Sequence, residues 1–542
     1  MATLNKKELI SYGALPNERQ KEWFERERCI FFHFGMNTFT GREWGDGGES
    51  PSLFNPTDCD VDSWVRTIKK AGFKCAILTA KHHDGFCLWP SKYTEHSVKN
   101  SPYKNGQGDI VKEFTDACRK YDMKAGIYLS PWDRHEKTWG SPEYNDYYAN
   151  QLNELFSNYG KIWECWWDGA GSTEAVYDWE RWAKTVRSLQ PDAVIFGSLG
   201  ATPWVDVRWV GNEKGVAGEP CYATIDANSL VVENTSELNS GKIGGNRFIP
   251  AEVDVSIRPG WFYHSEQDKD VRTPENLMEL YFQSVGRGAG LLLNIPPNEK
   301  GQLASADVEA VLEFNSRLEK AFENDLIKDA QAFEKGTKLE SSPLNGGLYI
   351  GGGEKSEFTI VMPEKREINT LLIGEALDYG QKITEIKASA YVCGVWQELF
   401  VAKSVGYKLI KRFDPVFTDE IKIEITGAEK APILNKLSAY LIKAEKKEDK
   451  KRTKINPKIK IVGNVAEIEL GGIYKFDTIT GDNVGEQGFS VYLFNGTSYD
   501  LVKTGKSMGL FYCKLDTPSE GAYRLKIVFD EKIEEEKIFE LE

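Results

Sequence analysis

Apolar runs typical of buried strands alternate with amphipathic helical segments between residues 29 and 322. A strand covered on both faces needs a continuous apolar run, whereas a helix that covers a sheet repeats its apolar residues every 3.6 positions. Eight strand-like runs occupy 29–35, 75–78, 124–130, 162–168, 193–199, 205–213, 249–257 and 289–295. Helix-like segments occupy 63–73, 109–123, 142–159, 176–189, 276–287 and 308–322. This α/β alternation predicts a (β/α)8 barrel, with a doubly wound open sheet as the alternative.

The chain beyond residue 332 changes to short β-like segments separated by turns. Such segments occupy 358–362, 368–373, 383–392, 421–425 and 437–442. They predict a β-sandwich of the galactose-binding type over 333–444, after a barrel domain over 1–332. The run 443–452, KAEKKEDKKR, is charged except for Ala444 and is typical of a solvated linker. A second β-sandwich module is expected over 452–542, with strands such as 489–494 and 523–529.

Composition excludes several classes of protein. The 542 residues include 68 basic and 82 acidic side chains, a net charge of −14, without a basic block that would bind nucleic acid. No apolar run is long enough for a membrane span. The nine cysteines follow no disulfide or metal spacing, so free thiols and neither metal nor cofactor are expected. Residues 1–7 lack the apolar core of a secretory signal, but a processed exported protein would look the same. Both export and a cytoplasmic location therefore stay open, as does the oligomeric state.

The fourth strand-like run ends in Trp166-Trp167-Asp168-Gly169, with a second glycine at Gly171. Glycine permits a sharp turn and a close approach of another molecule to the main chain. A carboxylate at the end of a buried strand costs several kcal/mol unless it is paired or used. A helix cap is the alternative explanation for Asp168. We interpret it as a functional carboxylate because other chemistry-bearing residues also follow strands.

Those residues are His33, His82, His83, Tyr128 and Glu213, which all lie at or near the ends of strand-like runs. In a parallel barrel the carboxyl ends of the strands meet at one face, where active sites are found. All six histidines and fourteen of the fifteen tryptophans lie in the first half of the chain, so the chemistry is expected there. Adjacent histidines on a strand point to opposite sides. The alternative to a binding role is therefore that one histidine of the pair is buried in the core and the other lies at the surface. The following Asp84-Gly85 offers a bend that turns both toward a ligand.

Two features indicate carbohydrate chemistry. Arg42-Glu43-Trp44 combines a carboxylate, which accepts hydroxyl hydrogen bonds, with an indole that stacks on a pyranose face. Glycoside hydrolysis requires two carboxyl groups that flank one bond. Asp168 is the first candidate, and Glu213, which ends RWVGNE, is the second. Glu252 and Asp254 compete with Glu213, and the sequence alone does not rank them.

Five motifs spread over residues 29–297 carry a family resemblance. They are His33-Phe34-Gly35, Arg42-Glu43-Trp44, Thr79-Ala80-Lys81-His82-His83-Asp84-Gly85-Phe86, Trp166-Trp167-Asp168-Gly169 and Leu291-Leu292-Leu293-Asn294. Together they resemble the α-L-fucosidases of glycoside hydrolase family 29. The resemblance implies a retaining exo-α-L-fucosidase that acts on fucosylated oligosaccharides or glycoconjugates, with Asp168 as the nucleophile and no cofactor or metal.

The resemblance also implies roles for other residues. Fucose-binding histidines map to His33, His82 and His83, hydroxyl contacts to Glu43, Trp44 and Tyr128, and a contact with the sugar's methyl group to Trp261. RWVGNE is similar to the subgroup that cleaves α-1,3/1,4-linked fucose from branched, Lewis-type glycans, which places the acid/base on Glu213. Glu252 stays open as an alternative acid/base and as a substrate contact.

Three other functions compete with this interpretation. One is a fucosidase of broad or α-1,2 specificity, and another is a glycosidase of different specificity, such as a galactosidase. The third is a non-catalytic carbohydrate-binding protein on the same scaffold, which would need neither Asp168 nor Glu213. The presence of both carboxyl groups favours an enzyme.

Overall fold

A computed structural model describes residues 9–171, 174–226 and 235–442 of the chain. It also describes the segments 458–462, 465–473, 475–476, 483–485, 487–494, 499–507, 509–516, 521–529 and 532–541. The predicted linker, 443–452, lies outside the described residues. No helix among those described is long and apolar enough to cross a membrane.

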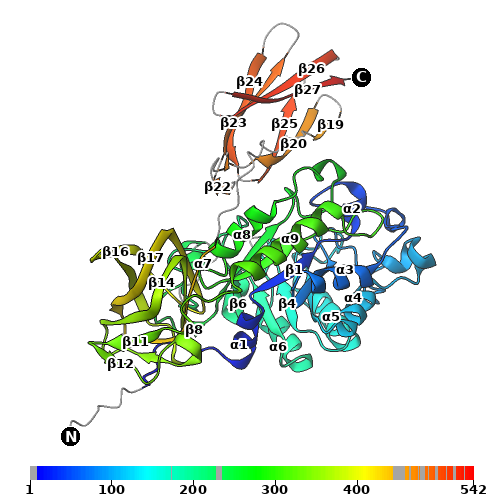
Figure 1. Ribbon diagram of the computed structural model, residues 1–542. Helices are drawn as coiled ribbons and strands as arrows, with labels where there is room; N and C mark the ends of the chain where they lie inside the picture. The colour runs from blue at the N-terminus through cyan, green and yellow to red at the C-terminus, as the bar shows by residue number, and fades with distance from the viewer. Residues whose placement is uncertain are drawn as a thin grey trace.

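Eight parallel strands close into a barrel in the first part of the chain (Figure 1). They are β1 (Arg28–Phe32), β2 (Cys75–Lys81), β3 (Lys124–Leu129), β4 (Glu164–Trp167), β5 (Val194–Gly197), β6 (Val207–Trp209), β9 (Ala251–Ser256) and β10 (Gly290–Asn294). The order around the barrel is β1-β10-β9-β6-β5-β4-β3-β2. The predicted (β/α)8 fold is confirmed, and the open sheet is excluded because β1 pairs with both β2 and β10.

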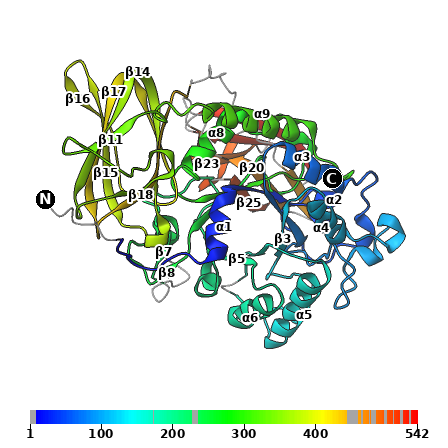
Figure 2. The same ribbon diagram turned by 60° about the horizontal axis from the view of Figure 1, so that its bottom comes forward.

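Helices cover the outside of the barrel, as the amphipathic segments predict (Figures 1 and 2). They are α3 (Val61–Lys70), α4 (Ile110–Lys120), α5 (Pro142–Asn158), α6 (Trp179–Leu189), α8 (Pro274–Gln283) and α9 (Ser305–Ala321). An aspartate caps several of them; the Asp109 carboxylate, for example, accepts a hydrogen bond from the Lys112 N–H at 2.9 Å. Two further helices in the first forty residues were not expected from the sequence: α1 (Glu18–Arg26) before the barrel and α2 (Met36–Thr40) after β1.

The barrel departs from strict alternation around β6. A 3-10 helix (Leu199–Trp204) replaces an α-helix between β5 and β6. The segment between β6 and β9, predicted as a loop over 214–247, contains the hairpin strands β7 (Thr224–Ile225) and β8 (Arg247–Phe248) and the helix α7 (Thr235–Ser240). Glu213 lies at the start of this segment.

An antiparallel sheet follows the barrel and lies beside it (Figures 1 and 2). Its strands are β11 (Gln331–Glu334), β12 (Thr337–Lys338), β13 (Tyr349–Ile350), β14 (Ser356–Glu375), β15 (Ile383–Val392), β16 (Val395–Ala402), β17 (Leu409–Ala428) and β18 (Ile433–Tyr440). Two predicted strands, 358–362 and 368–373, are parts of the single bulged strand β14. Contacts with the barrel include a stacked Phe24–Tyr407 pair at 4.7 Å, the Arg412–Glu279 ion pair at 2.5 Å, and a hydrogen bond from Ala223 N–H to Gln381 Oε1 at 2.8 Å.

The last part of the chain consists of antiparallel strands in the segments that the structure describes. These are β19 (Lys458–Val462), β20 (Val465–Ile473), β21 (Lys475–Phe476), β22 (Asn483–Gly485), β23 (Gln487–Phe494), β24 (Tyr499–Ser507), β25 (Gly509–Asp516), β26 (Gly521–Phe529) and β27 (Lys532–Leu541). The predicted strands 489–494 and 523–529 fall within β23 and β26.

Candidate active site

Asp168 is the first residue after β4, at the carboxyl end of the barrel. Alternation along β4 turns Trp166 into the barrel, where it stacks on Phe196 at 4.2 Å, and turns Trp167 outward against Trp179 of α6 at 5.6 Å. The Asp168 carboxylate accepts hydrogen bonds from the Ala170 N–H at 2.8 Å and from the Tyr128 hydroxyl at 3.3 Å. These contacts fix the orientation of the carboxylate at the face of the barrel where catalysis is expected.

Gly171 makes the turn after Asp168 possible. Its φ is +77°, and a Cβ there would lie 2.5 Å from the Tyr177 hydroxyl oxygen and 2.9 Å from the Trp139 ring. Both the backbone conformation and the lack of space require glycine at this position. The sequence expectation that glycine shapes the backbone next to Asp168 is confirmed at Gly171.

Three histidines lie together at the same end of the barrel. His33 follows β1, and His82 and His83 follow β2 in a turn that closes with a hydrogen bond from the Gly85 N–H to the His82 carbonyl. The ring centroids of His82 and His83 are 4.0 Å apart, and those of His33 and His82 are 5.6 Å apart. The bend therefore brings both adjacent histidines to one side, as the Asp84-Gly85 sequence predicts.

Protein partners fix the tautomer of each imidazole. His33 Nδ1 faces Asn294 Oδ1 at 2.9 Å and therefore donates to it. His83 Nδ1 faces Ser130 Oγ at 2.8 Å; since that hydroxyl donates to the Trp132 carbonyl, His83 Nδ1 also donates. The Nε2 atoms of His33 and His83 are then acceptors.

His82 has the opposite tautomer. Its Nδ1 accepts from the side-chain amide of Asn37 at 3.3 Å, so its Nε2 carries the proton and is a donor. Burial lowers the pKa of His33 to about 3 and that of His83 to about 4, and it holds the pKa of His82 well below its usual value. At neutral pH the cluster is uncharged and mixes hydrogen-bond donors with acceptors, which suits a ring of hydroxyl groups.

Glu43 and Trp44 lie on the loop after α2, next to the segment that follows β9. Glu43 Oε2 accepts a hydrogen bond from the Trp261 N–H at 2.8 Å, and Oε1 lies 2.7 Å from His264 Nε2. The Trp261 ring lies 5.0 Å from the His33 ring. Trp44 is 57% exposed and meets His83 edge-on at 6.4 Å between ring centroids. These four side chains thus border the histidine cluster.

Glu213 follows β6 between Gly211 and Gly215, which both have positive φ. Glu213 is exposed to solvent, although the protein partly desolvates its carboxyl group. This desolvation, together with the negative charge of Asp168, raises the pKa of Glu213 to about 7, while a hydrogen bond with the Trp261 side chain opposes the shift. Glu213 therefore lies close enough to Asp168 and Trp261 to interact with both.

Glu252 lies elsewhere. It is the second residue of β9, at the amino end of the barrel interior, and it is 0% exposed. It forms an ion pair with Arg26 and accepts a hydrogen bond from Trp166 Nε1 at 3.0 Å. The expectation that Glu252 contacts substrate fails here because the residue is two positions into its strand, where side chains fill the barrel.

Asp254, the other competitor of Glu213, is also inside the barrel. It accepts a hydrogen bond from Trp209 Nε1 at 2.9 Å, and burial followed by the charge of Glu213 holds its pKa well above the usual range. A buried, protonated carboxyl group below the site cannot easily exchange protons with solvent. The structure thus brings Glu213, rather than either competitor, to the face that carries Asp168.

Several residues of the site were missed from the sequence. They are Asn37, Ser130, Trp132, Asn294 and His264, which hold or border the residues named above. Asn294 has a signal in the sequence, because it ends the eighth strand in the LLLN motif. Asn37 lies on α2, a helix not expected from the sequence, and Ser130 and Trp132 lie in connecting segments, where no periodicity marks a side chain as functional.

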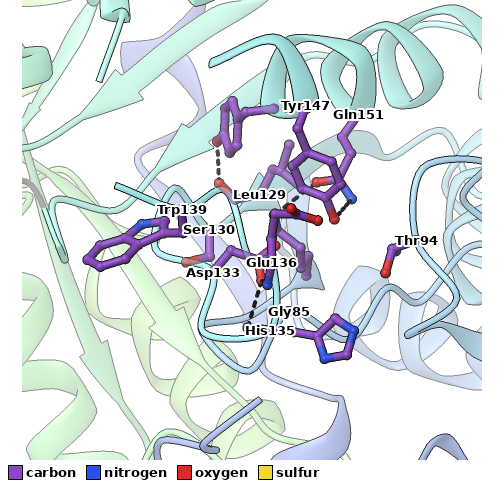
Figure 3. Close-up of polar contacts among 12 residues, drawn as sticks. Gly85, Thr94, Leu129, Ser130, Asp133, His135, Glu136, Trp139, Tyr147 and Gln151 are labelled. Carbon is purple, nitrogen blue, oxygen red and sulfur yellow. Dashed lines mark hydrogen bonds and ion pairs between the residues drawn. The ribbon is translucent and has the colours of Figure 1, made fainter. Parts of the chain in front are cut away.

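A buried polar network supports the loop that carries Ser130 and Trp132. The Lys81 ammonium donates to the Asp133 carboxylate at 2.8 Å and to Gln151 Oε1 at 2.9 Å. Asp133 also accepts from the backbone N–H groups of His135 and Glu136, at 3.1 Å and 2.9 Å (Figure 3). Lys81 immediately precedes His82 and His83, so this network joins the ends of β2 and β3.

Within the described residues, no group of three or more His, Cys, Asp or Glu side chains has the arrangement of a metal site. The residues gathered here are instead two carboxyl groups, neutral imidazoles, a phenol and indoles. That set can attack a carbon centre, transfer a proton and bind a polyhydroxylated ligand.

Comparisons with known proteins agree with this chemistry. Residues 9–321 match the family model described as alpha-L-fucosidase. Alpha-L-fucosidase 1 of Arabidopsis thaliana is 37% identical over 450 residues, which cover 79% of this chain and 88% of that protein.

Solved structures show the same relationship. A glycoside hydrolase 29 family member from an unknown rumen bacterium is 29% identical, with a TM-score of 0.75 over 98% of this chain and 100% of that chain. A Ruminococcus gnavus GH29 fucosidase in complex with fucose is 32% identical, with a TM-score of 0.73 over 81% of this chain and 97% of that chain. The chain therefore belongs to the α-L-fucosidase family, glycoside hydrolase family 29.

Proposed function

We propose that this α-L-fucosidase is a retaining exo-enzyme in which Asp168 is the nucleophile and Glu213 the general acid/base. The observation that carries the proposal is the contrast between the two carboxyl groups. Asp168 is oriented by the Ala170 N–H and the Tyr128 hydroxyl, whereas the pKa of Glu213 is raised to about 7. A carboxylate held by donors suits attack, and a carboxyl group that is about half protonated at pH 7 suits proton donation.

The reaction follows in two steps. In the first, an Asp168 oxygen forms a bond to the anomeric carbon while the glycosidic C–O bond breaks and Glu213 gives its proton to the departing oxygen. In the second, the Glu213 carboxylate takes a proton from water, and the resulting hydroxide attacks the anomeric carbon as the bond to Asp168 breaks. Two inversions release fucose with retained configuration.

The neutral histidines supply the binding of fucose. His33 and His83 offer acceptors at Nε2, whereas His82 offers a donor, so neighbouring hydroxyl groups find complementary partners. Glu43, Trp44 and Tyr128 extend the polar border, and the Trp261 ring beside His33 provides an apolar surface for the methyl group of fucose. The placement of these side chains around Asp168 supports the proposed roles.

A covalent intermediate tests the mechanism directly. Incubation with 2-deoxy-2-fluoro-α-L-fucosyl fluoride should label the wild-type enzyme once, on the peptide that contains Asp168, as measured by mass spectrometry. Proton NMR of the first product should show the α-anomer of fucose. Release of the β-anomer first, or a label on another residue, would contradict the assignment.

For linkage we propose α-1,3/1,4-linked fucose on branched, Lewis-type glycans. Support comes from the RWVGNE run that ends in Glu213. A branched acceptor offers the residues around Glu213 more hydroxyl groups than a linear one, and binding energy from a remote sugar can raise kcat. We expect kcat/KM to be far higher for a Lewis trisaccharide than for a 2-fucosyl disaccharide or a nitrophenyl fucoside. A higher value for either of the latter would overturn the linkage and leave the fucosidase activity standing.

A further inference from the structure

Three indoles lie next to one another beside His83. The Trp132 ring lies 5.0 Å from His83, Trp44 meets Trp132 at 6.0 Å and 73°, and Trp139 lies 6.5 Å from Trp132. We call Trp44, Trp132 and Trp139 the aromatic platform. It borders the site on the side of β2 and β3, and only Trp44 is among the residues that the sequence singled out.

Trp44 and Trp132 lie outside the hydrophobic core, whereas Trp139 packs against its edge. Trp44 is 57% exposed, and Trp132 and Trp139 are half-buried, whereas the core residues Trp23, Trp64, Trp89, Trp167 and Trp182 are at most 1% exposed. Within the described residues, neither the Trp44 nor the Trp132 indole N–H donates to a protein group. Adjacent exposed aromatic rings with unused donors, at the edge of a catalytic site, are typical of surfaces that bind a ligand.

The platform is also held rigidly. The Ser130 hydroxyl donates to the Trp132 carbonyl at 2.7 Å, and the Tyr144 hydroxyl donates to the Pro131 carbonyl at 2.8 Å. The neighbouring Asp133 is fixed by the buried Lys81 ammonium. A ring held in place before a ligand arrives loses little entropy on binding, so this support favours recognition.

Trp139 is connected to the loop of the nucleophile. Its indole N–H donates to the Tyr177 hydroxyl at 3.1 Å, and that hydroxyl donates to the Ala170 carbonyl at 3.2 Å. Ala170 in turn donates to the Asp168 carboxylate. The platform therefore has a fixed position relative to the atom that attacks the sugar.

We propose that Trp132 and Trp139, continuous with Trp44, form a stacking platform for the sugars to which fucose is attached. The inference rests on the proposed function, because it takes fucose to be bound at Asp168 and the histidines. Three rings offer more apolar surface than one fucose can cover, and indoles stack on the C–H face of a pyranose. The Arg134 guanidinium, 5.3 Å over the Trp132 ring, adds N–H donors for the hydroxyl groups of a stacked sugar.

The test compares substrates with and without those sugars. α-L-Fucosyl fluoride has no sugar in its leaving group, so it reports on chemistry and on the fucose site alone. The second substrate is whichever of the Lewis trisaccharide and the 2-fucosyl disaccharide the wild type cleaves faster. Trp132→Ala and Trp139→Ala are compared with Trp204→Ala, a matched control for an exposed tryptophan, 42% accessible, on the 3-10 helix before β6.

We expect Trp132→Ala to lower kcat/KM for the oligosaccharide about tenfold more than it lowers kcat/KM for fucosyl fluoride. Trp139→Ala should show the same pattern with a smaller loss, Trp132→Phe should restore most of the activity, and Trp204→Ala should change neither substrate. Circular dichroism and thermal unfolding check that each variant folds.

Other results separate the two proposals. Equal losses of kcat/KM on both substrates would show that Trp132 acts by supporting His83, and would overturn the platform. No loss on either substrate would also overturn the platform. In both cases the mechanism at Asp168 and the linkage preference, which are measured on the wild type, would stand. A wild type that cleaves fucosyl fluoride but neither oligosaccharide would overturn the linkage and the platform together.

Discussion

The two ends of the barrel contain the same kinds of residue in opposite electrostatic arrangements. At the amino end, Glu164 and Glu252 lie among Trp23, Trp163 and Trp166. At the carboxyl end, Asp168 and Glu213 lie among Trp44, Trp132 and Trp261. Glu164 and Asp168 are only four residues apart along the chain. Comparing them shows how the position of a carboxyl group in the barrel determines its environment.

At the amino end the charge is compensated within the protein. Arg26, at the end of α1, forms a fully buried ion pair with Glu252. Glu164 has no hydrogen-bond partner among the described residues, and burial together with the charge of Glu252 holds its pKa well above the usual range, which favours its uncharged form. At the carboxyl end, no Arg or Lys within the described residues forms an ion pair with Asp168 or Glu213. Those two carboxyl groups remain available to a substrate, which is the property that distinguishes the catalytic end.

The largest expected effect is that of Asp168→Asn. An amide cannot form the covalent intermediate, so kcat should fall about 10³-fold or more while the thermal unfolding midpoint stays near wild type. Glu164→Gln is the matched control at the other end of β4, and it should keep its kcat because the uncharged form of Glu164 is already favoured. Steady-state kinetics with a Lewis trisaccharide checks both variants. Near-normal turnover by Asp168→Asn would remove the distinction between the two ends.

Glu213→Gln should lower kcat for the oligosaccharide about 10²-fold, because the leaving oxygen then receives no proton. The pH profile gives a sharper test. The pKa of Glu213 is raised to about 7, so the wild type loses its proton donor, and kcat/KM falls, as pH rises through about 7. This alkaline limb should disappear in Glu213→Gln. A limb that persists in the variant would assign the titration to another group.

Arg26→Ala should affect stability and leave chemistry unchanged. It leaves the buried Glu252 without its cation, at an expected cost of about 3–5 kcal/mol in the free energy of unfolding. The kcat of the folded fraction should match wild type, since Glu252 is remote from Asp168. Urea denaturation and active-site titration measure the two quantities separately. A loss of kcat without a loss of stability would return Glu252 to the list of catalytic candidates.

The sequence predicts the barrel and much of its catalytic face for a physical reason. Strands buried on both faces leave long apolar runs, and parallel topology gathers whatever follows those runs at one end. His33, His82, Tyr128 and Asp168 could be placed together on that basis alone. Glu213 was singled out by the same pattern, an aromatic residue and a glycine before an acid.

Glu252 shows where such reasoning fails. Its function depends on how far along β9 it lies and on Arg26, a partner 226 residues away that belongs to a helix not expected from the sequence. The aromatic platform was missed for a related reason. Trp132 lies in a loop, and its neighbour Asp133 pairs with the buried Lys81, which belongs to another strand. Long-range polar pairing leaves no periodic trace, so these features require the three-dimensional structure.

The smallest expected effect is that of Tyr128→Phe, which removes the hydroxyl that donates to Asp168 at 3.3 Å. The ring would still pack against Trp166 at 5.3 Å, so folding should be unaffected. A hydrogen bond to a charged acceptor contributes about 1.5–3 kcal/mol, and this long one lies at the weak end, so kcat should fall about tenfold. Tyr148→Phe is the matched control: its hydroxyl donates to the Leu129 carbonyl at 2.6 Å, away from the carboxylate, and its loss should reduce stability while kcat is kept. If both variants lower kcat equally, the tyrosines act through the packing of β3, and the orientation of Asp168 does not depend on the Tyr128 hydroxyl.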